Sequence, residues 1–142
     1  MLIKIDRIPK IIRKRPFLIQ LDAVMEDRVD KCFREFISDR EARQDTASYW
    51  DGEMLFVTHY DKDKNVLEVA EAKYSLLVYS RTHKDLDVRS LFVSALFQTL
   101  DGYYVIVKSN HQKYNILGGM VDIVDLDGNT FNPEVTLSRE LM

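Results

Sequence analysis

Cysteine is almost absent from this sequence of 142 residues, in which Cys32 is the only one. A single thiol excludes an internal disulfide and any zinc site built from several cysteines. Such a composition is typical of a reducing compartment, so we expect a cytoplasmic protein. The histidines are also too scattered to predict a metal site, because no two have the spacing of ligands on a helix: His59, His83 and His111.

The sequence also has no large excess of positive or negative charge and no long apolar run. The 20 basic residues nearly balance the 23 acidic ones, and the net charge is -3 at pH 7. Bulk electrostatics therefore give no attraction for nucleic acid, and we expect no such partner. No apolar run approaches the ~20 residues that cross a bilayer. Residues 1–7 alternate apolar and charged side chains, which is not the pattern of a signal peptide, so we expect no membrane partner.

One basic cluster interrupts this balance near the N-terminus, at Lys10, Arg13, Lys14 and Arg15. We interpret it as a solvated connector after a short strand over residues 2–8 that Pro9 ends. The alternative is an arm that grips phosphate.

The hydrophobic content of 46% is enough for one domain with a sizeable core. Apolar residues recur at helical spacing from Asp22, a plausible N-cap, to Arg40, and predict an amphipathic helix that packs against a sheet. Cys32 lies in its apolar face, where a buried structural thiol is expected.

The rest of the chain alternates strand and turn signals. Strands are expected over 54–60 and 66–80 around a turn at 61–65, and a hairpin over 91–99 and 103–108 around Asp101-Gly102. A further strand from Tyr114 leads into Gly118-Gly119, where backbone can approach a ligand closely. The fold class expected is α+β, with a mixed or antiparallel sheet and packed helices.

A helix should begin at Asn132-Pro133-Glu134, because Asn caps free amides and Pro tolerates the first helical position. This helix carries Arg139, Glu140 and Leu141. Asp122, Asp125 and Asp127 lie before it and are candidate additional ligands, although Asp127-Gly128-Asn129 is also a turn signal.

A glycine pair at a strand end, followed by a helix with Arg-Glu-apolar, resembles the Nudix hydrolase signature. Gly119 matches its first glycine, Pro133 its common helix-start proline, and residues 139–141 its Arg-Glu-apolar core. Phe131 stands at the position of an early glutamate. The resemblance covers about residues 90–142 and implies the first half of a Nudix-like α/β/α sandwich, with residues 1–89 as an N-terminal extension.

The resemblance implies hydrolysis of a nucleoside diphosphate linked to another group, with Mg²⁺ or Mn²⁺ as cofactor. Glu140 would be a metal ligand beside the Gly119 carbonyl, and Arg139 would hold the helix carboxylates in place, so Arg139 and Glu140 are the expected catalytic residues. Two further glutamates of the signature would follow Met142. We therefore expect an incomplete chain of weak or no activity.

The alternative is a noncatalytic α/β module, for binding or assembly, that keeps the Nudix strands. In either case the apolar strands over 91–99 and 103–108 would leave a face uncovered, so we expect a homo-oligomer.

Overall fold

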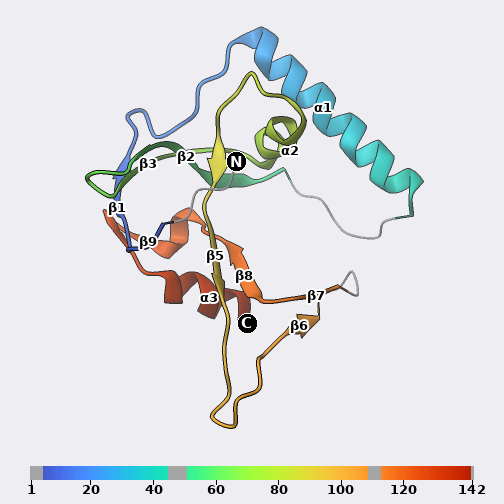
Figure 1. The fold of residues 1–142 in the computed structure, drawn as a ribbon. Coiled ribbons are helices and arrows are strands. Elements are labelled where there is room, and N and C mark those ends of the chain that lie inside the picture. The colour runs from blue at the N-terminus through green and yellow to red at the C-terminus, as the bar shows by residue number, and fades with distance from the viewer. Residues whose placement is uncertain (1–4, 45–50, 109–112, 142) are drawn as a thin grey trace.

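A four-stranded mixed sheet organises the chain, whose computed structural model describes residues 5–44, 51–108 and 113–141 (Figure 1). The strand order is β1-β3-β2-β4, and β1 runs parallel to β3 while the other neighbours are antiparallel. The strands are β1 (Lys10–Arg13), β2 (Glu53–Asp61), β3 (Val66–Lys73) and β4 (Arg89–Ser90). With three α-helices, this arrangement belongs to the α+β class that was expected from the sequence.

The predicted turn between β2 and β3 is present at residues 62–65 and ends at Asn65, which has φ 52°. Its side-chain amide donates to the carbonyl of Ile8 at 3.2 Å, and its own carbonyl accepts from Lys10 N at 3.0 Å. The turn therefore also holds the start of β1. The prediction of a strand over residues 2–8 is wrong for residues 5–8, because β1 begins only after Pro9. The remaining residues of that prediction, 2–4, lie outside the described ranges.

Two helices cover one face of the sheet. α1 (Ala23–Ala42) confirms the predicted helix, and the Asp22 side chain caps it by accepting from Met25 N at 2.8 Å. It packs mainly along α2 (Tyr74–Thr82) rather than directly on a sheet, and Val29 is its buried residue. Cys32 is half-buried, not fully buried as expected. No helix in the described part of the chain is both long and apolar enough to cross a membrane.

The strand predicted over 66–80 ends at Lys73, because α2 begins at Tyr74. The free backbone N–H groups in the first turn of α2 are bound by residues from a distant segment. The Asp51 carboxylate accepts from Ser75 N at 2.7 Å, and the backbone oxygen of Gly52 accepts from Tyr74 N at 2.8 Å. The residues that follow are buried on all sides of the helix, so their sequence is a continuous apolar run that also suits a strand.

The opposite face of the sheet is covered by the C-terminal part of the chain. Its elements are β5 (Phe92–Ala95), β8 (Leu117–Met120), the 3₁₀ helix η1 (Ile123–Asp125), β9 (Leu126–Asp127), β10 (Thr130–Phe131) and α3 (Pro133–Leu141). The predicted turn at 127–129 joins β9 to β10, with Gly128 at φ 59°. Asn132 caps α3 as predicted, since its side chain accepts from Glu134 N at 3.0 Å.

The pleat of β2 divides the hydrophobic core in two. Leu55 joins a cluster with residues of β1, β3, β5 and β10, while Phe56 points to the other face, toward α1 and α2. The first cluster contains buried residues from both sides of residue 89: Ile11, Leu55, Leu67, Val69, Val93, Val121 and Phe131. Ranges 1–89 and 90–142 therefore share a core, and their boundary falls inside β4.

The hairpin predicted over 91–99 and 103–108 forms only at its tip. β5 pairs with β8 instead, so Val93 lies opposite Gly119, and the tip keeps a single bridge between Gln98 and Tyr104. β6 (Val107–Lys108) pairs with β7 (Tyr114–Asn115). Gly102 has φ 92°, as the turn signal required. The glycine pair 118–119 lies within β8 rather than at a strand end.

Replacing Gly118 by alanine should destabilise the chain more than the same change at Gly119. A Cβ at Gly118 would lie 2.7 Å from the backbone oxygen of Val93, inside the β5–β8 pairing, and backbone cannot move away cheaply. The three atoms nearest to a Cβ at Gly119 all belong to the side chain of Glu140, which is flexible and can rotate away. We expect Gly118→Ala to lower the free energy of unfolding by about 1–3 kcal/mol, measured by urea denaturation; equal effects of the two changes would contradict this packing.

Candidate functional site

An ion pair between Asp125 and Arg139 joins η1 to α3. The guanidinium binds both carboxylate oxygens, with Nε at 3.1 Å from Oδ1 and Nη2 at 3.0 Å from Oδ2. The Asp125 side chain is 1% exposed and that of Arg139 is 38% exposed, so the anion is inside the protein and the cation reaches it from the surface.

The buried carboxylate of Asp125 has further donors on the Oδ2 side. Thr136 Oγ1 donates to it at 2.9 Å, and the backbone N–H of Asp122 donates at 3.0 Å. Burial opposes ionisation, but hydrogen bonds from Arg139, Asp122 and Thr136 outweigh it and lower the pKa of Asp125. The carboxylate is therefore charged at neutral pH, as a buried anion with this many donors should be.

The same guanidinium sets the position of Glu140. Arg139 Nη2 donates to the carbonyl of Met120 at 2.8 Å, which ties α3 to the end of β8, and Nη1 contacts Glu140 Oε1 at 3.1 Å. The Glu140 side chain then lies over Gly119, where an added Cβ would sit 2.6 Å from Oε1. Glycine is needed at residue 119 for this contact.

A cavity of about 360 Å³ opens beside this contact, between the start of β2, the end of β8 and α3. Its polar lining includes Arg139 and three carboxylates, those of Glu53, Asp122 and Glu140. Its apolar lining includes two aromatic rings and two methionines: Tyr74, Phe92, Met54 and Met120. A small cavity with apolar walls and a few convergent polar groups is the usual form of a ligand site.

The sheet supplies carboxylates to the same region. Glu53 and Leu55 share one face of β2, and Glu71 lies opposite Leu55 on β3, so the apolar face of the sheet ends in two acids. Burial raises the pKa of Glu71, and the charge of Glu53, a hydrogen bond with it and the charge of Asp122 raise it further. Negative charge is therefore concentrated where the core meets the cavity.

The residues predicted from the sequence are only partly brought together. Gly119, Arg139 and Glu140 meet at the cavity, and Asp122 lines it, while Asp127 lies in the β9–β10 hairpin. Phe131 is buried in the core, and the acid that binds Arg139 is Asp125. Among the described residues, no three His, Cys, Asp or Glu side chains stand together in an arrangement that could hold a metal ion.

Sequence reasoning missed Glu53 and Glu71. The sequence contained a signal for both residues. Each is an acid at a position of β2 or β3 where the alternation of the strand places a core-facing, normally apolar, side chain. An acid at a core-facing position next to a strand end marks a place where the core opens to water or to a ligand.

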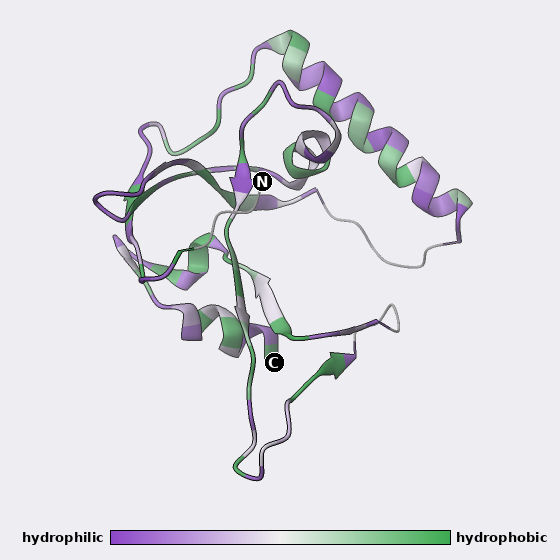
Figure 2. Ribbon diagram, viewed as in Figure 1, coloured by the Kyte–Doolittle hydropathy of each residue, from purple (hydrophilic) through white to green (hydrophobic). Residues whose placement is uncertain are grey.

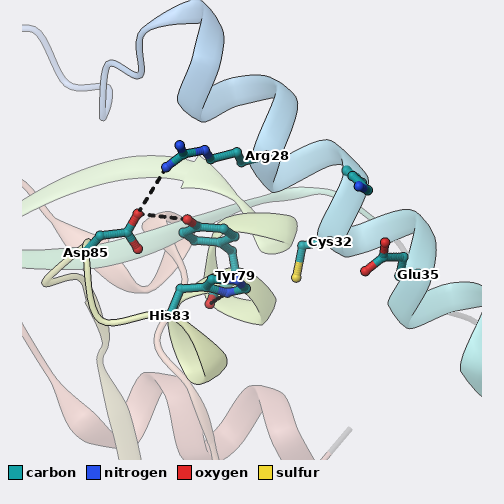
Figure 3. A pocket seen from close by; sticks show the side chains of 7 residues that line it. Arg28, Cys32, Glu35, Tyr79, His83 and Asp85 are labelled. Carbon is teal, nitrogen blue, oxygen red and sulfur yellow. Dashed lines mark hydrogen bonds and ion pairs between the residues drawn. The ribbon is translucent and has the colours of Figure 1, made fainter.

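A second cavity, of about 420 Å³, lies between α1 and the C-terminal end of α2 (Figure 3). Tyr79 donates to Asp85 at 2.8 Å, Arg28 approaches Asp85 at 3.9 Å, and the ring of His83 stacks on Tyr79 with centroids 4.1 Å apart. Burial, then the hydrogen bond to Asp85, raises the pKa of Tyr79. Cys32 and Glu35 complete the α1 side. The contacts of Asp85 with Tyr79 and Arg28 join α1, α2 and the segment that follows α2 at this cavity.

No protein-family model, curated protein or solved structure matches this chain.

Arg139→Ala should lower the free energy of unfolding by about 2–3 kcal/mol, because it leaves the Asp125 carboxylate buried without its cation. The cost is below the ~3–5 kcal/mol of a fully buried pair, since Arg139 is 38% exposed. Arg43→Ala removes a pair in which both side chains are exposed, with Asp39, and serves as the control with an effect below about 1 kcal/mol. Similar urea midpoints for the two variants would show that the buried pair does not hold α3.

Glu71→Gln should stabilise the chain at neutral pH. The folded-state pKa of Glu71 is raised, so its ionisation costs stability as pH rises through that value, and the cost is absent in acid where the group is protonated in both states. The gain in thermal midpoint over the unaltered chain should thus be greatest near pH 7 and vanish below about pH 4. Thermal unfolding at a series of pH values measures it; a constant offset would exclude charge crowding as the cause.

Proposed function

We propose that the cavity is the centre of a Nudix-type hydrolase that acts on a nucleoside diphosphate linked to another group. The observation that carries this proposal is the contact of Glu140 with Gly119, fixed by the ion pair of Arg139 with Asp125. These are the glycine, arginine and glutamate on which the resemblance of the sequence rests. The α/β/α sandwich of that family is part of the proposal, supported by α1 and α2 on one side of the four-stranded sheet and by α3, which packs on β5 and β8 and against the core cluster of the other side (Figure 1).

Asp125 supports the proposal in another role than the one expected from the sequence, where it was a candidate additional ligand. The signature has an early glutamate before its helix, and Phe131 had stood at that place. In the structure an acid between Gly119 and α3 binds the helix arginine through two nitrogens. We therefore propose that Asp125 has the role of the early glutamate of the signature, with a side chain that is one methylene shorter.

The cavity offers the carboxylate chemistry of a hard divalent cation, although no three of the described side chains are arranged to hold one. Carboxylate oxygens are the ligands that Mg²⁺ and Mn²⁺ prefer, and Glu140 would be one of them, with the backbone of Gly119 beside it. When bound, such an ion neutralises phosphate charge and lowers the pKa of an attacking water. Arg139 holds Glu140 in place, and the carboxylates of Glu53 and Asp122 face the same space. The aromatic walls, Tyr74 and Phe92, offer flat apolar surface for a base or sugar.

A noncatalytic binding or assembly module is the second candidate. It is favoured by the lack, among the described residues, of three side chains arranged for a metal ion. Such a module would bind a ligand in the cavity without metal-dependent turnover. The homo-oligomer expected from the sequence is also proposed, and it concerns apolar surface away from the cavity.

We expect Mg²⁺-dependent hydrolysis of nucleotide sugars or dinucleoside polyphosphates to be slow, because a single helix carboxylate would hold the metal ion weakly and the phosphate charge would then be neutralised incompletely. Glu140→Gln keeps the shape of the side chain and removes a charged ligand, so it should lower the rate by a further ~10²-fold. Glu134→Gln, an exposed change in the first turn of the same helix, is the matched control and should have no effect. Release of nucleotide is measured with and without metal.

Binding of the metal itself separates the two candidate functions. Mn²⁺ should broaden the NMR signals of Gly119, Asp122 and Glu140 selectively, and Glu140→Gln should abolish this effect. Two results together identify the module: a ligand binds to the cavity without any dependence on metal, and neither the unaltered chain nor the Glu140→Gln variant hydrolyses the substrates. Rapid turnover by the Glu140→Gln variant removes the hydrolase assignment of that carboxylate.

A further inference from the structure

The segment of residues 96–106, called the arm here, extends away from the rest of the protein between β5 and β6 (Figure 1). Figure 2 shows that much of it is hydrophobic. Seven of its large apolar or aromatic side chains are exposed: Leu96, Phe97, Leu100, Tyr103, Tyr104, Val105 and Ile106. Leu100, at the tip, is as exposed as a free side chain.

The arm is ordered by its own hydrogen bonds. Val105 N donates to Phe97 O at 3.0 Å, and Thr99 N donates to Tyr103 O at 2.8 Å, with the Gln98–Tyr104 bridge between them. The Thr99 hydroxyl donates to the Asp101 carboxylate at 2.6 Å and closes the tip. The arm is thus a preformed ribbon, and ordering it on association costs little entropy.

The outer edges of this ribbon have no strand partner in the described part of the chain. Unpaired edges of an exposed apolar ribbon are a template for a further strand. Proteins usually protect such edges with charged side chains or proline. Between residues 91 and 107 the sequence has neither, except for Asp101, which is held in the tip turn.

The exposed area is that of an interface. An aromatic side chain has roughly 150–250 Å² of surface, and with the exposed fractions of 42–111% found for the seven residues, together they present at most on the order of 800 Å². The largest apolar patch of a typical monomer is about 300–600 Å², whereas a stable complex buries about 800 Å² on each partner. The apolar surface of the arm is therefore larger than a typical monomer exposes, and pairing with a second copy would bury a part of it.

We propose that the arm is the contact through which two copies of this chain associate, by pairing edge to edge about a twofold axis. An uncharged surface complements itself, and an antiparallel pair of identical strands is symmetric about such an axis. A partner recognised by charge would require charged groups on the arm, and Asp101 is the only one between residues 91 and 107. The proposal names the surface of the expected homo-oligomer and does not rest on the hydrolase function.

Sedimentation velocity over about 1–200 µM tests the proposal, a range chosen to bracket the micromolar constants of modest interfaces. The mass of the unaltered chain should approach twice 16.7 kDa as concentration rises. The combined change Tyr103→Lys and Ile106→Lys places charges on the arm and should leave a monomer, with the thermal midpoint preserved because both side chains are exposed. Val24→Lys, at an exposed apolar residue of α1, should associate like the unaltered chain.

A photoreactive residue in place of Leu100 gives a second measurement that does not depend on the lysine changes. Cross-links between copies should map to residues 96–106 of the second copy. A chain that stays monomeric throughout, an assembly that survives the two lysines, or cross-links that map outside the arm would each overturn the proposal.

Discussion

The buried carboxylate of Asp125 is the constraint on which the C-terminal part of this protein depends. A charge that is 1% exposed must be compensated, and its donors come from α3 and from the backbone that begins η1. Arg139 also binds the last carbonyl of β8. One ion pair therefore fixes the strand, the 3₁₀ turn and the helix relative to one another, although each is too short to be stable alone.

The position of Glu140 follows from this constraint. Once α3 is fixed, the side chain of Glu140 lies against Gly119, where only a glycine leaves room. The carboxylate of Glu140 lines the same cavity as Glu53, which stands at the end of the sheet. Burial, and then the charges of Glu53 and Asp122, raise the pKa of Glu71 beside the cavity, so ionising this carboxylate is unfavourable for folding. Under the proposed hydrolase function, a bound cation would lower that cost.

Local signals predicted much of the chain correctly. Asp22, Asn132 and the turn at 127–129 act through neighbours a few residues away, so their roles are readable from the sequence. Features that depend on residues far away in the sequence could not be predicted. α2 is started by Asp51, 24 residues upstream, and β5 pairs with β8 across an intervening arm rather than with the nearest apolar run. The pairing of Arg139 with Asp125 joins residues 14 apart, and the sequence alone gave no reason to prefer Asp125 over Asp122.

Diffraction from crystals soaked in Mn²⁺ tests the proposed role of Glu140 as a metal ligand, because the ion is located by its anomalous scattering. We expect a peak in the cavity at ~2.1 Å from a Glu140 carboxylate oxygen, next to Gly119, with the Asp125–Arg139 pair intact. A cavity without such a peak at saturating Mn²⁺, or a peak bound only by other residues, would contradict the assignment of Glu140 as a metal ligand.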